Sequence, residues 1–497
     1  NGDPDNPIDG AHLFAQNGSI TLGGSAFLSA DGTGGDGANG GDGGDGSGGW
    51  ATIHAANSNG GPSFITITGV ESGGYVSADG QGGDGGSGAS GTAGASGTTG
   101  TDGSAGSAGG SGGDGAGGTA SILANAGNGH VTISYASGTA TGSGGAGGNG
   151  GAGGDGGSGS AGAGGNGGAG GSGGTGGSGA GGNVTIGTAS GNNQSATANL
   201  GTADYGSIFA DASAFGGVGG SGGGSGLGGS GTPAGTAGSG GLGGGGGDAL
   251  GGWGILLVRG SEVTFDSAEL HADGWGGSGG FGPGGSPVTG DGGDGTGGWL
   301  GVIVTNRYLQ EDQAGTLIGG TVIGTASGIG GAGALAGTGF VGDGATVQVE
   351  DSTASISSLA FTASGAAVAP GSDASAIAID NGSLTVTGAF SLDTDGDLSL
   401  FVDQGAMTVG SLTLSARDFV ADGVYDDVYT NLGTVTAGSA TITTGNNFIA
   451  TADLDINSNF YLYAPGYIDA HGFDIDGLFY MRAAGGDVTV EDLLASG

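Results

Sequence analysis

Short stretches of this chain alternate apolar and polar residues with a period of two. Examples are SFITITG at residues 63–69, GHVTISY at 129–135 and SEVTFDS at 261–267. Alternation built from Val, Ile, Thr and Phe is typical of β-strands that bury one face. We expect the buried face to include these side chains: Ile65, Ile67, Val131, Ile133, Val263 and Phe265.

Six of the alternating stretches end in the same departure motif. An Ala is followed by a small or acidic residue, Gly or Ala, any residue and Gly-Gly, as in SADGTGGDG from Ser29 and HADGWGGSG from His271. The same departure implies the same corner of successive repeats, so we predict that the six alanines line one column. They are Ala30, Ala78, Ala140, Ala212, Ala272 and Ala326.

Each departure opens a glycine-rich tract that closes with a return motif such as GGWATI from Gly48 or GGWLGV from Gly297. We number these tracts as inserts 1 to 6 in chain order and expect all of them to leave from one side. Their approximate ranges are 31–49, 79–118, 141–182, 213–252, 273–298 and 327–344.

Between inserts, units of about 20–30 residues made of short strands repeat without a helical period, which is the signature of a β-solenoid. One unit cannot bury its own inward face, but stacked coils bury a continuous column. We therefore predict an all-β fold, a right-handed parallel β-helix. Residues 1–346 would be coils interrupted by the inserts, and residues 347–497 an uninterrupted β-helix.

The longest inserts repeat Gly-Gly-x, as in GGAGGNGGAGGDGG from Gly144. Three residues per turn is the period of the polyproline-II helix, which glycine also adopts, and which forms no hydrogen bonds within itself. We expect polyglycine-II-like hairpins stacked side by side, with Ala, Ser, Asn and Asp on the outward third position. The alternative is a disordered Gly/Ser linker.

The charge balance excludes several partners. Lys and Arg number 4 against 45 Asp and Glu, and the net charge is −41. Such a chain offers no surface for phosphates, so nucleic acid and anionic membranes are not expected partners. There is no Cys, and no apolar run is long enough for a membrane span, so we expect a protein that is not inserted in a membrane.

Clustered aspartates in the inserts suggest one possible cofactor, calcium, because oxygen ligands suit this ion. The segments GGDGGDGSG and GGSGGDGAG approach the calcium-binding nonapeptide but lack its hydrophobic position. Solvated carboxylates are the alternative. The candidate ligands are Asp36, Asp42, Asp45, Asp291 and Asp294.

All four Trp residues lie at insert boundaries. We expect an indole to cover the mouth of a tract, and the alternative is a row that stacks on sugar rings. They are Trp50, Trp253, Trp275 and Trp299.

An enzyme is not expected. The G-x-S-x-G and G-x-G-x-x-G matches arise from glycine tracts that lack the strand-to-helix context those motifs need. Four Arg supply little positive charge for a polysaccharide lyase, whereas paired carboxylates leave a hydrolase open.

The strand triplets in MTVGSLTLSA, GGDVTVEDLLASG and NGSITLGG resemble those of filamentous-haemagglutinin-like exoproteins and autotransporter passengers. The resemblance covers the strand segments and implies a right-handed parallel β-helix, export by a Gram-negative bacterium, and an adhesive or matrix role. GGAGGNGGAGG is similar in composition to mycobacterial glycine-rich repeat proteins and to the polyglycine-II bundles of phage adhesins and arthropod antifreeze proteins.

These observations together favour a secreted structural or adhesive protein of the bacterial cell surface, with self-association, neighbouring subunits or surface glycans as partners. The first alternative is a subunit of a self-assembled extracellular filament or sheath. The second is ice binding, for which we expect no thermal hysteresis. Ala495-Ser496-Gly497 resembles another departure motif, so we expect a longer native chain or an end covered by another subunit.

Overall fold

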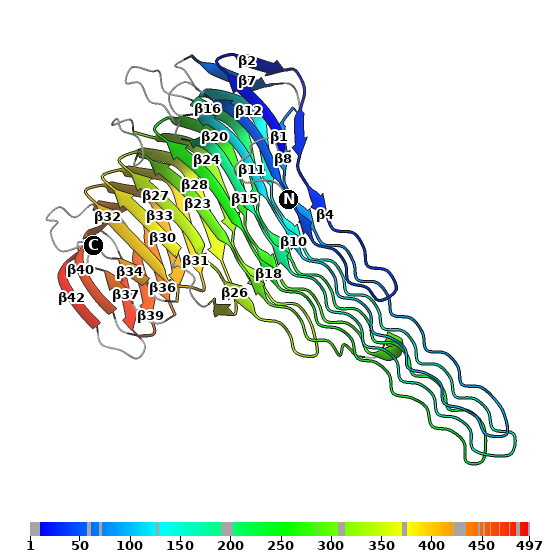
Figure 1. The fold of residues 1–497 in the computed structure, drawn as a ribbon. Coiled ribbons are helices and arrows are strands. Elements are labelled where there is room, and N and C mark those ends of the chain that lie inside the picture. Colours follow the sequence, from blue (N-terminus) through cyan, green and yellow to red (C-terminus); the bar gives the residue numbers. More distant parts are fainter. Residues whose placement is uncertain are drawn as a thin grey trace.

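The computed structural model describes these residues: 10–56, 61–68, 72–125, 129–189, 202–285, 287–306, 314–369, 375–417, 419–421, 434–445, 448–450, 453–457, 459–466, 468–476, 478–483 and 488–495. Over this part of the chain the fold is all-β, and the prediction of a parallel β-solenoid is confirmed. Each strand pairs in parallel with its counterpart in the next coil, and the coils advance in chain order from blue to red (Figure 1).

Each coil begins with a strand that pairs with the first strand of its neighbours. These first strands are β1 (Gly10–Gln16), β6 (Trp50–Ala56), β11 (Thr119–Asn125), β15 (Asn183–Ala189), β19 (Trp253–Arg259), β23 (Trp299–Thr305), β27 (Gly344–Glu350), β30 (Ser375–Asp380), β32 (Leu398–Asp403), β34 (Phe419–Ala421), β37 (Phe448–Ala450) and β40 (Ile468–Ile475).

One longer strand, or two shorter ones, returns along the other side of each coil. These strands are β2 (Ser19–Leu22), β3 (Ala26–Ser29), β7 (Ser63–Ile67), β8 (Gly74–Ser77), β12 (Gly129–Thr139), β16 (Thr202–Asp211), β20 (Glu262–His271), β24 (Thr316–Thr325), β28 (Thr353–Ala363), β31 (Ser383–Thr394), β33 (Ala406–Ala416), β35 (Thr434–Ala437), β36 (Ala440–Thr444), β38 (Asp453–Ile456), β39 (Phe460–Ala464) and β41 (Phe479–Ala483). The strand β42 (Val488–Ala495) pairs with β40 along its whole length and begins the next coil.

The interior consists of aliphatic columns that run along the solenoid. Each strand alternates inward apolar and outward polar side chains, and parallel register places like on like. The side chains predicted from the alternation to face inward are all buried. One column contains, in order, Leu13, Ile53, Ile122, Ile186, Leu256, Val302, Val347, Ile377 and Leu400.

A tight turn links the first strand of a coil to the next strand. In several coils it contains a residue in the left-handed region, which Asn, Asp and Gly adopt with the least strain. Examples are Asn17 (φ 53°), Gly260 (φ 52°), Asp351 (φ 47°) and Asn381 (φ 46°). These turns lie at the opposite end of the first strand from the inserts.

The inserts depart and return through two small parallel sheets. The departure sheet contains β4 (Gly32–Thr33), β9 (Gly80–Gln81), β13 (Gly142–Ser143), β17 (Ala214–Phe215), β21 (Gly274–Trp275) and β25 (Gly328–Ile329). The return sheet contains β5 (Gly46–Ser47), β10 (Gly115–Ala116), β14 (Gly179–Ala180), β18 (Ala249–Leu250), β22 (Gly295–Thr296), β26 (Gly339–Val341) and β29 (Ala367–Val368). A short 3-10 helix, η1 (Pro283–Gly285), lies at the tip of insert 5, between its outgoing and returning arms.

The predicted column of departure alanines is confirmed. The N–H of Ala78 donates to the carbonyl oxygen of Thr139, the residue before Ala140, and the other departure alanines make the equivalent bond. All six inserts therefore leave from one side of the solenoid, and Figure 1 shows them projecting in the same direction as extended lines of unequal length. The boundary predicted at residue 346 falls inside β27 (Gly344–Glu350).

Two histidines near the start of the solenoid make its stability depend on pH. Burial lowers the pKa of the His54 imidazole, and a hydrogen bond between Nε2 and Asn125 Oδ1 (2.6 Å) offsets this only in part. Burial also lowers the pKa of His130. A histidine whose pKa is lower in the folded chain takes up its proton more readily after unfolding, so acid favours the unfolded state.

We predict that the melting temperature is insensitive to these groups above a pH of about 6.5 and falls as the pH decreases below it. Replacing His54→Gln keeps a donor for Asn125 and removes one titrating group, so this variant should lose less stability between about pH 7 and about pH 5. Thermal unfolding followed by circular dichroism measures both. Equal pH dependence in the two chains would contradict the assignment.

Candidate functional site

The inserts form a two-layer body, which we call the glycine slab. Each insert has an outgoing arm that leaves the departure sheet and a returning arm that enters the return sheet. The outgoing arms lie side by side in one layer and the returning arms in the other. We call the exposed surfaces of these layers the departure face and the return face.

The Gly-Gly-x period assigns each position of a triplet a different direction. In insert 3, the N–H of Gly147, at the first position, donates to Val218 in the same layer of insert 4 (2.8 Å). The N–H of Gly148, at the second position, donates to Gly110 in the opposite layer of insert 2 (2.7 Å). Asn149, at the third position, is exposed. The same pattern recurs along the arms.

Glycine is required at the first two positions because other backbones are already in contact there. A Cβ on Gly147 would lie 2.1 Å from the carbonyl oxygen of Gly174, and a Cβ on Gly148 would lie 2.1 Å from that of Gly86. Neither separation is possible for real atoms. A Cβ on Gly224, at a third position, would meet nothing within 4 Å. The glycine content of the first and second positions thus follows directly from the contact between neighbouring arms.

Insert 2 carries side chains at its second position wherever insert 1 no longer covers it. Insert 1 is short, and the Cα of Gly88 lies beside its tip at Gly40. On the covered side of this point, second positions are glycine (Gly83, Gly86, Gly110 and Gly113). Beyond it they are Ala, Thr and Ser: Ala89, Thr92, Ala95, Thr101, Ser104 and Ser107.

Hydroxyl groups replace the missing neighbour as hydrogen-bond partners on this flank. The hydroxyl of Ser107 accepts the N–H of Ala89 (2.7 Å), and that of Ser104 accepts the N–H of Thr92 (2.7 Å). Thr101 does the same for Ala95 (2.7 Å). The flank is therefore both blocked by side chains and satisfied in hydrogen bonds, and it offers little to a further glycine arm.

On the opposite flank, insert 4 also carries side chains where its neighbour, insert 5, no longer covers it, here at first positions. A Cβ on Gly240 would lie 2.2 Å from the Pro283 side chain at the end of insert 5. Farther out, where insert 5 has ended, the corresponding positions of the returning arm are Ala237 and Ala234.

Aspartates at third positions accept backbone hydrogen bonds from the next insert. The N–H of a third position points along the slab surface, and a carboxylate one insert earlier receives it. Asp45 Oδ1 accepts the N–H of Asp114 (2.9 Å), and Asp114 Oδ1 accepts that of Ser178 (2.7 Å). Asn149 and Asn166 do the same for Ser221 and Thr236 (2.8 and 2.9 Å).

The five aspartates predicted to bind calcium all belong to this ladder. The Oδ1 atom of each accepts a backbone N–H group from the next insert. The pairs are Asp36 with Asp84, Asp42 with Ser111, Asp45 with Asp114, Asp291 with Leu335, and Asp294 with Thr338. They are not gathered: Asp36 lies on an outgoing arm, and the other four on returning arms of inserts 1 and 5. In the part of the chain that the structure describes, no three His, Asp or Glu side chains gather closely enough to hold a metal ion. Calcium binding stays a prediction.

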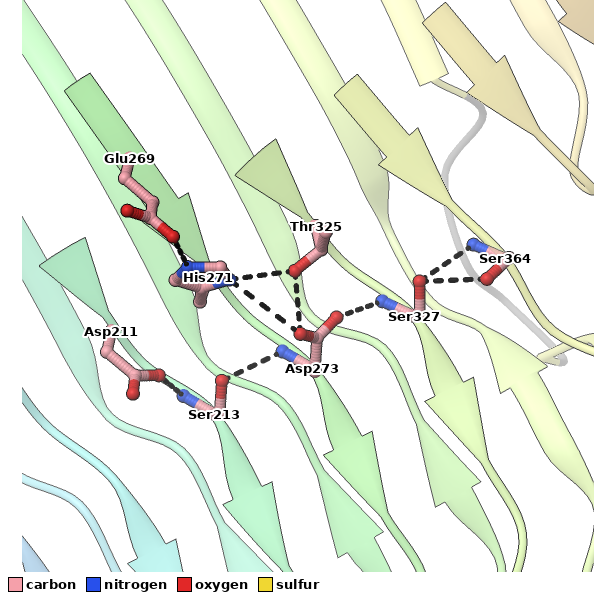
Figure 2. A network of polar contacts seen from close by, with 8 residues as sticks. All are labelled: Asp211, Ser213, Glu269, His271, Asp273, Thr325, Ser327 and Ser364. Atoms are coloured by element: carbon pink, nitrogen blue, oxygen red, sulfur yellow. Dashed lines mark hydrogen bonds and ion pairs between the residues drawn. The ribbon is translucent and has the colours of Figure 1, made fainter. Parts of the chain in front are cut away.

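A second polar ladder fixes the inserts where they leave the coils (Figure 2). Asp273, in the departure motif of insert 5, accepts the N–H of Ser327 (2.6 Å) and the hydroxyl of Thr325 (2.6 Å). His271 lies between Glu269 (Nε2 to Oε1, 2.9 Å) and Thr325 (Nδ1 to Oγ1, 2.9 Å). The ladder continues on both sides through Ser213, whose hydroxyl accepts the N–H of Asp273, and through Ser327 and Ser364.

Asp31 is the equivalent residue at insert 1. Partial burial alone would raise the pKa of its carboxyl group. Hydrogen bonds from the hydroxyls of Ser29 and Ser77 and from the N–H of Asp79 outweigh that effect and hold the pKa below its usual value. The carboxylate is thus used in its charged form, as an acceptor.

The four Trp residues lie in two separate columns. Trp50, Trp253 and Trp299 each begin a first strand, but Thr119 and Asn183 lie between the first two, so the row is interrupted. Trp253 and Trp299 meet edge to face (5.8 Å, 78°). Trp275 belongs to the departure sheet, where its ring stacks on Phe215 (4.7 Å, 9°). A shallow groove of about 430 Å³ on the return side is lined by Asp248, Leu250, Asp294 and Phe340, among others.

The chain matches no protein-family model and no curated protein sequence. Within the described parts of the chain, helices long and apolar enough to span a membrane are absent.

We predict that Gly174→Ala destabilises the slab by about 1–3 kcal/mol, because the new Cβ would lie 1.9 Å from the carbonyl oxygen of Gly110. Gly224→Ala is the matched control, since its Cβ enters open space and an alanine lowers the entropy of the unfolded chain. Thermal unfolding of both variants tests the lattice. Equal melting temperatures for the two would contradict it.

We predict that the third-position ladder needs an acceptor and not a charge. Changing Asp45, Asp114, Asp248 and Asp294 together to Asn should leave the melting temperature nearly unchanged in chelator. Changing them together to Ala should cost about 0.5–1 kcal/mol for each lost bond.

The same variants test the calcium prediction. A calcium site would raise the melting temperature of the parent chain in calcium relative to chelator, and the Asn variant would lose that rise. In that case the carboxylates are ligands as well as acceptors.

Proposed function

We propose that this chain is a secreted structural or adhesive protein of the bacterial surface, in which the solenoid is the rod and the glycine slab a plate for packing or attachment. The observation that carries the proposal is the arm lattice. Two of every three residues are used to hold arms together, and only the third faces outward. Such a body is a rigid presentation surface.

Three further features support a role in contact. The departure ladder of Figure 2 uses its carboxylates, hydroxyls and imidazole to hold one insert against the next. The third-position aspartates likewise accept backbone N–H groups. The slab projects well clear of the coils (Figure 1), which places its faces where another surface can reach them.

Within this proposal, each arm is a polyglycine-II helix and the solenoid is right-handed. Three observations fit that helix. Burial along an arm repeats every three residues, the hydrogen bonds of the slab do not lie within an arm, and each arm bonds to arms on either side. A filament or sheath subunit is the second candidate, favoured by the exposed apolar side chains on the slab, such as Phe215 and Phe281.

The test compares the chain with a variant whose slab is trimmed. Residues 86–109, 148–173 and 220–243 are each replaced by Gly-Asn-Gly. This follows the tip of insert 1, where the N–H of Gly41 closes a turn on Ala38, with glycine in place of that alanine because positions 86, 148 and 220 are covered by the preceding insert. All inserts are then short, and no covered glycine loses its neighbour. We expect the parent chain to bind intact producer cells and the trimmed variant to bind them much less.

Circular dichroism verifies that the trimmed variant keeps its solenoid. Immunogold labelling of intact and permeabilised producer cells tests the surface location separately. Labelling only after permeabilisation would overturn the proposed location, and undiminished binding by the trimmed variant would overturn the role of the slab.

A further inference from the structure

One part of the departure face is apolar and carries no charge. Inserts 4 to 6 place large apolar side chains at third positions there, and most of them are about half exposed: 41% for Phe215, 52% for Val218 and Phe281, and 50% for Ile329. Ser278 and Ala332 complete the area. We call this area the apolar patch, defined by Phe215, Val218, Trp275, Phe281 and Ile329.

The rest of the slab differs from this patch. The flank on insert 2 ends in Ala, Ser and Thr side chains, whose hydroxyls take up the free N–H groups, and the flank on insert 4 ends in Ala. The departure face over inserts 1 and 2 carries Asp36 and Asp84. The return face carries these carboxylates: Asp42, Asp45, Asp102, Asp114, Asp248, Asp291 and Asp294.

The rings in the patch are not laid flat for a planar ligand such as a sugar. Phe215 and Trp275 stack on each other with centroids 4.7 Å apart and planes 9° from parallel. Their faces are therefore directed along the row of inserts, and their edges toward solvent. Standing side chains of this kind favour a partner with grooves into which they can insert.

The slab itself has such grooves. Third-position side chains recur about every 9 Å along an arm, at three residues of about 3.1 Å each, and bare glycine backbone lies between them. A surface whose ridges fit these grooves over several rows must have the same period. A second slab, turned face to face, has that period, and a twofold arrangement makes the same patch serve both partners.

Charge favours the same partner geometry. Two copies of a chain with net charge −41 repel each other, and the repulsion is weakest where the surfaces that meet carry no carboxylate. The patch meets this condition and the return face does not. We propose that the apolar patch is the docking surface for a second copy of this chain, slab against slab.

This inference rests on the proposed role of the slab as a contact plate, and names one partner for it. The patch spans three inserts, so each partner buries less than the roughly 800 Å² typical of a stable interface. We therefore expect association at micromolar concentrations, strengthened when salt screens the repulsion between the acidic chains.

Sedimentation velocity over a range of concentrations, at about 0.05 M and about 0.5 M NaCl, tests the proposal. We expect a monomer–dimer equilibrium that shifts toward dimer in the higher salt. Val218→Asp should weaken it at least tenfold by placing like charges in the interface. The variant suits the fold, because an aspartate there can accept the N–H of Ser278 as Asp155 accepts that of Leu227 (2.8 Å).

Leu242→Asp is the matched control, a 65% exposed leucine on the return face, and should leave the equilibrium unchanged. A chain that stays monomeric at high salt, or an equilibrium weakened equally by both variants, would overturn the proposal. Either result is independent of cell binding by the trimmed variant, so failure of the dimer and failure of the proposed function are separable.

Discussion

The structure depends on how the backbone N–H groups of the glycine arms find acceptors. The extended arms make their backbone hydrogen bonds to other arms and not within themselves, so the donors and acceptors of each arm must be satisfied by neighbouring arms or by water. Bonds such as Gly147 to Val218 within a layer and Gly148 to Gly110 between layers require backbones in contact, which only glycine allows. An arm of this kind is therefore stable only as part of a set.

The solenoid is what assembles that set. Parallel strands in adjacent coils lie about 4.8 Å apart, and the arms leave through departure and return sheets that keep this pairing. Each arm thus starts beside its neighbour and in register with it, which offsets much of the entropy that free glycine tracts would lose on ordering. The aliphatic columns below, such as Ile53–Ile122–Ile186, hold the arms together indirectly.

Much of this architecture could be predicted from local sequence. The alternation in SFITITG identified Ile65 and Ile67 as buried, and the repeated departure motif identified one corner. The role of the aspartates could not be found that way. Asp114 and Ser178 are partners across 64 residues of sequence, and only the register between inserts 2 and 3 brings them together. Aspartates close in sequence, such as Asp36 and Asp42, instead lie in opposite layers. The length of insert 1 relative to insert 2 could have been predicted from the sequence. The second positions of insert 2 change from Gly to Ala, Thr and Ser where insert 1 ends.

The lattice also separates what folds the slab from what the slab presents. First and second positions are fixed by contact, whereas a third position needs only a side chain that suits the surface, and either Asp or Asn can serve as its acceptor. A carboxylate differs from the amide in adding repulsion that keeps slabs from associating at random. The lattice also forms without the carboxylate, as Val218 and Phe281 show by lying in the same lattice as Asp84. The pattern of third positions can therefore change from acidic to apolar across one face while the backbone beneath it stays the same. Specificity in such a plate lies in one residue of every three.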